Sequence, residues 1–147
     1  VRRGGGQRDY SLSPRQRGWL AATAVVALSL LAIARGLTPS PTGRGTHQQL
    51  GLAPCWILER TGVPCPSCGM TTAWAHVARG ELRRAVRANL AGALSAVAAV
   101  SAAPWLILSA LAGRWLWLRP TLRITLIAAT VWLAVAILDW AVRLAIG

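Results

Sequence analysis

The stretch that decides the fold is residues 90–111, LAGALSAVAAVSAAPWLILSAL. It contains no charged residue, and at about 1.5 Å per residue a helix of this length covers the roughly 30 Å hydrocarbon core of a bilayer. Its small residues Gly92, Ser95 and Ser101 would let a second helix approach closely, which is how helices pack in lipid. The stretch therefore predicts a membrane-spanning helix.

Two further apolar segments complete the pattern, at about 19–35 and 122–140, and each is long enough to cross the hydrocarbon core. The first also resembles a cleaved signal peptide, because a basic segment precedes it and Ala32-Ile33-Ala34 matches a cleavage site. An uncleaved anchor is favoured, since the apolar run is long for such a peptide. The sequence therefore predicts an all-α integral membrane protein with three transmembrane helices and a short interfacial helical segment between the first and second.

Composition and charge support the same class. The protein has 147 residues, of which 54% are hydrophobic, and its net charge of +12 comes from 16 arginines set against four acidic residues. The arginines flank the apolar segments and form no continuous basic face, so we predict the lipid bilayer as a partner and no nucleic acid. The arginine- and glycine-rich composition of residues 1–18 predicts a basic, disordered cytoplasmic arm. A single membrane domain follows over residues 19–147.

The arginines give conflicting signals about the side that the segment between the first two spans faces. Those before the first span favour a cytoplasmic N-terminus, whereas a second basic group before residue 90 favours the reverse. Because the earliest helix usually sets the orientation, we predict that the intervening segment lies outside the cytoplasm, where thiols tend to pair.

All three cysteines lie in this intervening segment, a loop with short helices over residues 50–89. The sequence CPSCG at residues 65–69 follows Cys55, and His76 comes shortly after it. The prolines and the glycine favour a tight turn at the membrane surface, ahead of a basic interfacial helix. Any chemistry of this protein is expected in this turn.

Three uses of these residues are open. Thiolates separated by two residues can bind one tetrahedral ion, so Cys55, Cys65, Cys68 and His76 are candidate ligands for zinc. Cys65 and Cys68 are also a candidate redox pair with Cys55 as a resolving thiol, although the strand-helix unit of thioredoxin-like enzymes is absent from the pattern. The third use, which we favour, is structural, with a disulfide or buried thiols that fix the turn.

Polar residues also stand at the ends of the predicted spans. Asn89 precedes the second span, where it would cap the helix or hydrogen-bond to another helix. Asp139 and Arg143 lie near the end of the third, at a spacing that would let them face each other on a helix. We favour the interpretation that these two charges simply mark the helix end.

The cysteine segment resembles a family of small bacterial membrane proteins catalogued as domain of unknown function 2752, over roughly residues 50–138. The residues that carry the resemblance are Cys55, GVPCPSCGMTTA at residues 62–73, RGEL at residues 79–82 and Asn89. The chain departs from the family at Thr72, where arginine is frequent, and at Leu90, where proline is frequent. The resemblance implies a multi-pass protein of the bacterial inner membrane, and it implies no established activity.

These features favour a non-catalytic accessory or structural component of the membrane, with other membrane protein subunits as partners and with a cysteine loop that is a disulfide staple or a metal knuckle. The sequence contains no nucleophile-elbow, P-loop or dinucleotide-binding pattern, which argues against an enzyme. The alternative is a membrane thiol-disulfide oxidoreductase that uses Cys65 and Cys68.

Overall fold

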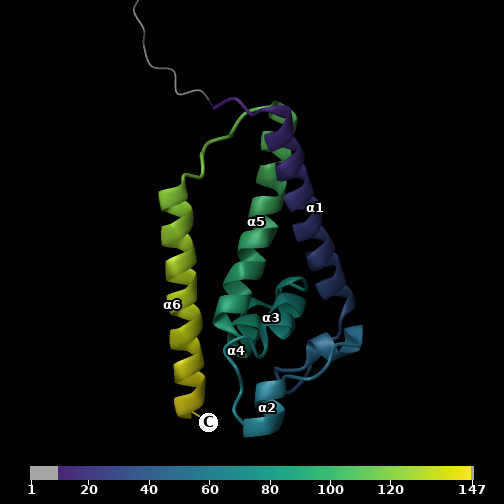
Figure 1. Ribbon diagram of the computed structural model, residues 1–147. Helices are drawn as coiled ribbons and strands as arrows, with labels where there is room; N and C mark the ends of the chain where they lie inside the picture. The colour runs from purple at the N-terminus through teal and green to yellow at the C-terminus, as the bar shows by residue number, and fades with distance from the viewer. Residues whose placement is uncertain (1–9, 147) are drawn as a thin grey trace, which may run out of the picture.

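The computed structural model describes residues 10–146, and helices dominate it. Three helices are long and apolar enough to cross a membrane: α1 (Pro14–Gly36), α5 (Leu90–Ala112) and α6 (Leu122–Ile146). Their bounds overlap the three predicted spans, so the all-α fold with three transmembrane helices is confirmed. α1 and α5 run side by side in opposite directions, and α6 stands next to α5 at a wider spacing (Figure 1).

Four short helices connect α1 to α5, and they gather at one end of this long pair (Figure 1). They are η1 (Thr46–Leu50, a 3-10 helix), α2 (Trp56–Thr61), α3 (Met70–Val77) and α4 (Leu82–Ala88). They form the short helical segment that the sequence predicts between the first two spans. The start of α1 and the α5–α6 connection lie at the opposite end, whereas the C-terminus of α6 returns to the end with the short helices (Figure 1).

Small side chains set the distances between the packed helices. Ala24 of α1 and Ala103 of α5 are fully buried, and these two helices form the most extensive contact in the described part of the chain. α3 packs closely on α5, because a Cβ added to Gly92 would lie 3.0 Å from the Cα of Met70. Gly92 therefore has the role that the sequence predicts for small residues in this span, which is to admit a second helix.

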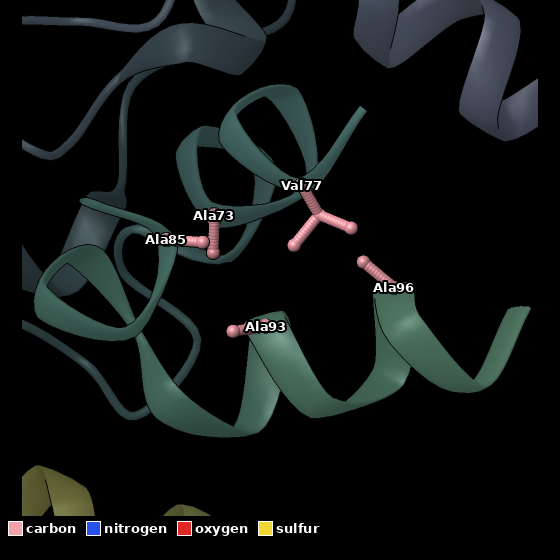
Figure 2. Close-up of a cluster of buried hydrophobic side chains, with 5 residues drawn as sticks. All are labelled: Ala73, Val77, Ala85, Ala93 and Ala96. Carbon is pink, nitrogen blue, oxygen red and sulfur yellow. The ribbon is translucent and has the colours of Figure 1, made fainter. Parts of the chain in front are cut away.

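A thin apolar cluster joins α3, α4 and α5 (Figure 2). Its members are four alanines and one valine, namely Ala73, Val77, Ala85, Ala93 and Ala96. Because these side chains are short, the three helices can approach each other closely, and the cysteine segment that leads into α3 is held against the end of α5. Trp74 packs against the same cluster and donates a hydrogen bond from Nε1 to Ser95 Oγ at 3.0 Å.

α1 begins earlier than predicted, at Pro14 and not at residue 19. The cause is a capping box, in which Ser13 Oγ accepts from the Gln16 amide and Gln16 Oε1 accepts from the Ser13 amide. Leu12 is buried, and its amide donates to the Gly113 carbonyl at 2.9 Å. The predicted arm of residues 1–18 is therefore shorter in the structure, since residues 10–18 belong to the fold; residues 1–9 lie outside the described residues.

α6 touches the rest of the chain chiefly through polar groups. Trp132 Nε1 donates to the Ala91 carbonyl at 3.1 Å, and the last turns of α6 reach the cysteine segment. Most apolar side chains of α6 are exposed, as expected for a helix whose remaining surface faces lipid. Hydrogen bonds from Trp140 and Arg143 to backbone carbonyls of residues 64–68 connect α6 directly to the cysteine turn.

Candidate metal centre

Cys65 and Cys68 face each other across a tight turn. The Cys68 amide donates to the Cys65 carbonyl at 3.0 Å, and the Met70 amide donates to the Ser67 carbonyl at 3.0 Å, so the turn continues into α3. The two Sγ atoms lie 3.3 Å apart, and both side chains are buried. A separation of two residues thus brings both sulfurs to one point, as the sequence predicts for a tight turn.

Cys55 joins this pair from a separate segment. It is the residue that precedes α2, and it is half-buried. The Sγ atoms of Cys55, Cys65 and Cys68 all lie within 4.8 Å of one another, and all three thiols are free. We call these three residues the thiol cluster. Thiolates bound to one tetrahedral zinc ion lie about 3.8 Å apart, so the cluster matches a three-sulfur site with small adjustments.

His76 is not part of the thiol cluster, although the sequence makes it a candidate fourth ligand. Its Nδ1 lies 2.6 Å from Glu81 Oε2. This hydrogen bond outweighs the opposing effect of desolvation and, with a smaller contribution from the charge of Arg84, holds the pKa of Glu81 below its ordinary value. The turn at Gly80 and Glu81, just after α3, places the Glu81 carboxylate within reach of the His76 imidazole. In this structure His76 therefore stabilises the turn at the C-terminal end of α3.

A cavity of about 380 Å³ opens beside the thiol cluster. Besides the three cysteines, His47 and Glu59 line it, and His47 Nε2 lies 3.1 Å from the Ala53 carbonyl oxygen. Nothing in the spacing of His47 and Glu59 relative to the cysteines marks them in the sequence. His47 and Glu59, and not His76, are the imidazole and carboxylate side chains that line this cavity within the described part of the chain.

The two turn thiols differ in acidity. At Cys65 burial raises the pKa, but hydrogen bonds with Ser67, Cys68 and Cys55 outweigh burial and lower the pKa from 9.0 to about 7. At Cys68 burial, together with the hydrogen bonds to Cys65 and Cys55, raises the pKa to about 12. Cys65 is therefore the sulfur in the cluster that ionises first, and its neighbours stabilise the thiolate.

Asn89 holds the turn from the side of α5. Its Nδ2 donates to the Pro66 carbonyl at 3.0 Å and to the Cys68 carbonyl at 3.2 Å, while its Oδ1 accepts from the Gly92 amide at 2.7 Å. The side chain is fully buried, and all of its polar atoms are hydrogen-bonded. The predicted cap is confirmed, whereas the alternative of a bond to another helix is not met, because the amide of Asn89 bonds to the turn ahead of α3.

α6 holds the same turn from the other side. Arg143 donates from Nη1 to the Cys68 carbonyl at 3.0 Å and from Nη2 to the Pro66 carbonyl at 3.2 Å. Its Nε lies 3.0 Å from Asp139 Oδ2 in a poorly aligned ion pair. The interpretation that these two charges merely mark the helix end is therefore wrong, because their pairing presents the guanidinium to the turn.

The linker after α1 is fixed to α3 by a buried hydroxyl pair. Thr46 Oγ1 and Thr72 Oγ1 lie 2.8 Å apart, and both residues are fully buried. The Ser40 amide donates to Thr46 Oγ1 at 3.0 Å. Thr72 is therefore buried as a neutral, hydrogen-bonded residue. This contact brings the linker to the wall of the cavity beside the cysteines.

The helices and the thiol cluster together describe a small, multi-pass α-helical membrane protein with a cysteine-lined centre at one end. Residues 55–103 match the family described as Protein of unknown function (DUF2752), which confirms the resemblance seen in the sequence over a shorter stretch than predicted. The match begins at Cys55 and ends within α5, so it contains all three thiols and Asn89. Comparisons with curated proteins and with solved structures found no match.

Proposed function

We propose that this protein is a non-catalytic component of the bacterial cytoplasmic membrane whose thiol cluster binds one zinc ion as a structural centre. The observation that carries this proposal is the convergence of three sulfurs from two separate segments. A disulfide would use two of them and leave the third thiol beside it, whereas a metal ion uses all three. Soft thiolate ligands select zinc or copper(I) over hard cations.

The packing around Cys55 supports a structural role for the ion. α2 contains no buried residue, so packing contributes little to its position. An ion bound by the cluster would join Cys55, just ahead of α2, to the turn at Cys65 and Cys68. Structural zinc sites stabilise small folds in this way, because the free energy of binding becomes free energy of folding. His47 and Glu59 line the cavity from which a fourth ligand would come.

The test is the zinc content of the purified protein in detergent, measured by inductively coupled plasma mass spectrometry. We expect about one zinc per chain, and we expect Cys55→Ser, Cys65→Ser and Cys68→Ser each to lower the content at least tenfold. Limited proteolysis gives a second readout: a chelator should accelerate cleavage in α2, because α2 then loses its connection to the turn.

His76→Gln is the matched control for the cysteine variants. It removes the fourth ligand that spacing alone suggests, yet His76 contacts Glu81 and lies outside the thiol cluster. We expect it to retain zinc. Wild-type protein that carries no metal after growth with added zinc, or a His76→Gln variant that loses zinc as fully as the cysteine variants, would contradict this proposal.

A thiol-disulfide oxidoreductase is the second candidate, and the 3.3 Å separation of the Cys65 and Cys68 sulfurs favours it. The Cys65 thiolate would attack a disulfide of a partner protein and release one partner thiolate. Cys68, on losing its proton, would then attack the mixed disulfide, which forms the Cys65–Cys68 bond and releases the second partner thiolate. Two electrons thus pass to the partner, and its disulfide is reduced to two thiols.

Thiol labelling separates the two candidates. For the oxidoreductase, maleimide labelling of Cys65 and Cys68 in the wild-type protein, assigned by peptide mass spectrometry, should fall after treatment of cells with a disulfide oxidant and recover with reductant. A chelator should have no effect on this change. Labelling that responds to the chelator and ignores the redox state would exclude the oxidoreductase.

A further inference from the structure

A groove lined by arginines lies between α4 and the loop that follows α1. It consists of two cavities of about 520 and 550 Å³ that share Arg87 and the Thr42-Gly43 backbone as walls. We call it the arginine groove, and it is defined by its four arginines: Arg84 and Arg87 line the first cavity, and Arg44, Arg87 and Arg143 line the second. Its residues are distinct from the thiol cluster.

The positive charge of the groove is only partly neutralised by the protein. Arg44 and Arg87 are exposed, and neither guanidinium group has a hydrogen-bond or ion-pair partner among residues 10–146. Within the described chain, no carboxylate lines either cavity. Two guanidinium groups therefore face the groove with all of their donors free for a ligand.

The other charged groups at the groove already have partners. Arg84 Nη1 lies 3.3 Å from Glu81 Oε1, and the second oxygen of that carboxylate contacts His76. Arg143 is paired with Asp139 and bonded to the turn. These residues add positive potential at the groove without being free to reorganise, so Arg44 and Arg87 are the groups that would contact a bound anion.

The groove lies beside the start of α5 and the end of α6, so in a bilayer crossed by these two helices it would lie where they leave the hydrocarbon core. Only Asn89 separates the end of α4 from the start of α5. Arg143 and Leu144, which line the second cavity, belong to the last turn of α6. This is the depth at which lipid phosphates lie, just outside the hydrocarbon core. Ser40 and Thr42 add two hydroxyl groups to the first cavity, and their Oγ atoms lie 2.9 Å apart.

We propose that the arginine groove binds a phosphate-bearing anion, supplied by the headgroup of an anionic phospholipid. Guanidinium groups bind phosphate through paired, charge-assisted hydrogen bonds, and the two cavities on either side of Arg87 give room for a phosphate and for the polar part of a headgroup. The anion would contact none of the three cysteines, and Arg87 does not line the cavity beside them, so the result for Arg87→Gln does not depend on the zinc proposal.

The experiment is native mass spectrometry of delipidated protein in detergent, titrated with phosphatidylglycerol or with phosphatidylcholine. We expect a preference for phosphatidylglycerol, and we expect Arg44→Gln and Arg87→Gln each to weaken its binding about fivefold. Arg60→Gln is the matched control: Arg60 is exposed on α2 at the same end, stacks on the Trp56 ring at 5.7 Å and lines neither cavity. It should leave binding unchanged.

Inorganic phosphate distinguishes the two sources of the anion. If phosphate displaces phosphatidylglycerol from wild-type protein only at high concentration, the lipid headgroup is the ligand. If phosphate binds the wild type but not Arg87→Gln and no lipid preference exists, the groove binds a phosphate group, and the ligand is a soluble phosphate compound. Equal losses of phosphatidylglycerol binding in Arg44→Gln, Arg87→Gln and Arg60→Gln would assign binding to diffuse surface charge. No preference between the two lipids, together with no binding of phosphate, would show that the groove binds neither. Either outcome overturns the proposal.

Discussion

Gly69→Ala is expected to prevent folding, with a loss of about 3 kcal/mol or more in the free energy of unfolding. Gly69 follows the cysteine turn with φ of 91°, a conformation that disfavours any side chain. An added Cβ would overlap the Ala88 carbonyl oxygen and lie 2.9 Å from the Gly43 carbonyl oxygen. Both are backbone atoms of packed segments, so neither can move without disturbing α4 or the linker.

The measurement is the yield of monodisperse protein in mild detergent, followed by unfolding in increasing dodecyl sulfate. Gly80→Ala is the matched control, because Gly80 has φ of 77° but no heavy atom within 4 Å of an added Cβ. It should lose about 1 kcal/mol from backbone strain alone. Similar losses in the two variants would show that the close approach at Gly69 is not the cause.

The three spans could be predicted from the sequence because their signal is local. A helix that satisfies its own backbone in lipid needs only a long apolar run, and residues 90–111 provide one without reference to the rest of the chain. The early start of α1 was also available locally, since Ser13, Pro14 and Gln16 form a capping-box pattern. The charges before residue 19 nevertheless favour a solvent-exposed arm, which is why the sequence predicts a later start.

The site is different, because its geometry depends on contacts between distant segments. The turn at Cys65 and Cys68 follows from spacing, but the arrival of Cys55 depends on a linker that the Thr46–Thr72 bond and the close approach at Gly69 hold in place. No spacing rule encodes these contacts.

The roles of the other polar residues were equally hidden. The spacing of Asp139 and Arg143 allows a pair on one helix, yet the carbonyls that Arg143 binds are 75 and 77 residues away in the chain. His76 pairs with Glu81, and sequence proximity to the cysteines gave no sign of this partner. The partners of Arg143 are distant in the chain and that of His76 is only five residues away, but in both cases the three-dimensional contact decides the role of the residue.

Asn89→Ala should lower the free energy of unfolding by about 2–3 kcal/mol and release zinc from the thiol cluster. About 1 kcal/mol comes from the lost helix cap at Gly92, and the rest from the lost hydrogen bonds to the Pro66 and Cys68 carbonyls. Unfolding in dodecyl sulfate and zinc content measure the two effects separately.

Asn89→Ser separates these two roles, since serine still caps α5 but has no amide to donate to the turn. We expect it to recover only the contribution of the cap, about 1 kcal/mol of the stability lost in Asn89→Ala, while zinc is still released. Each of the two carbonyls accepts from both Asn89 and Arg143, so either residue partly compensates for the other. Combining Asn89→Ser with Arg143→Lys should therefore destabilise the protein by about 1 kcal/mol more than the sum of the single changes. Strict additivity would mean that the two side chains act on the turn independently.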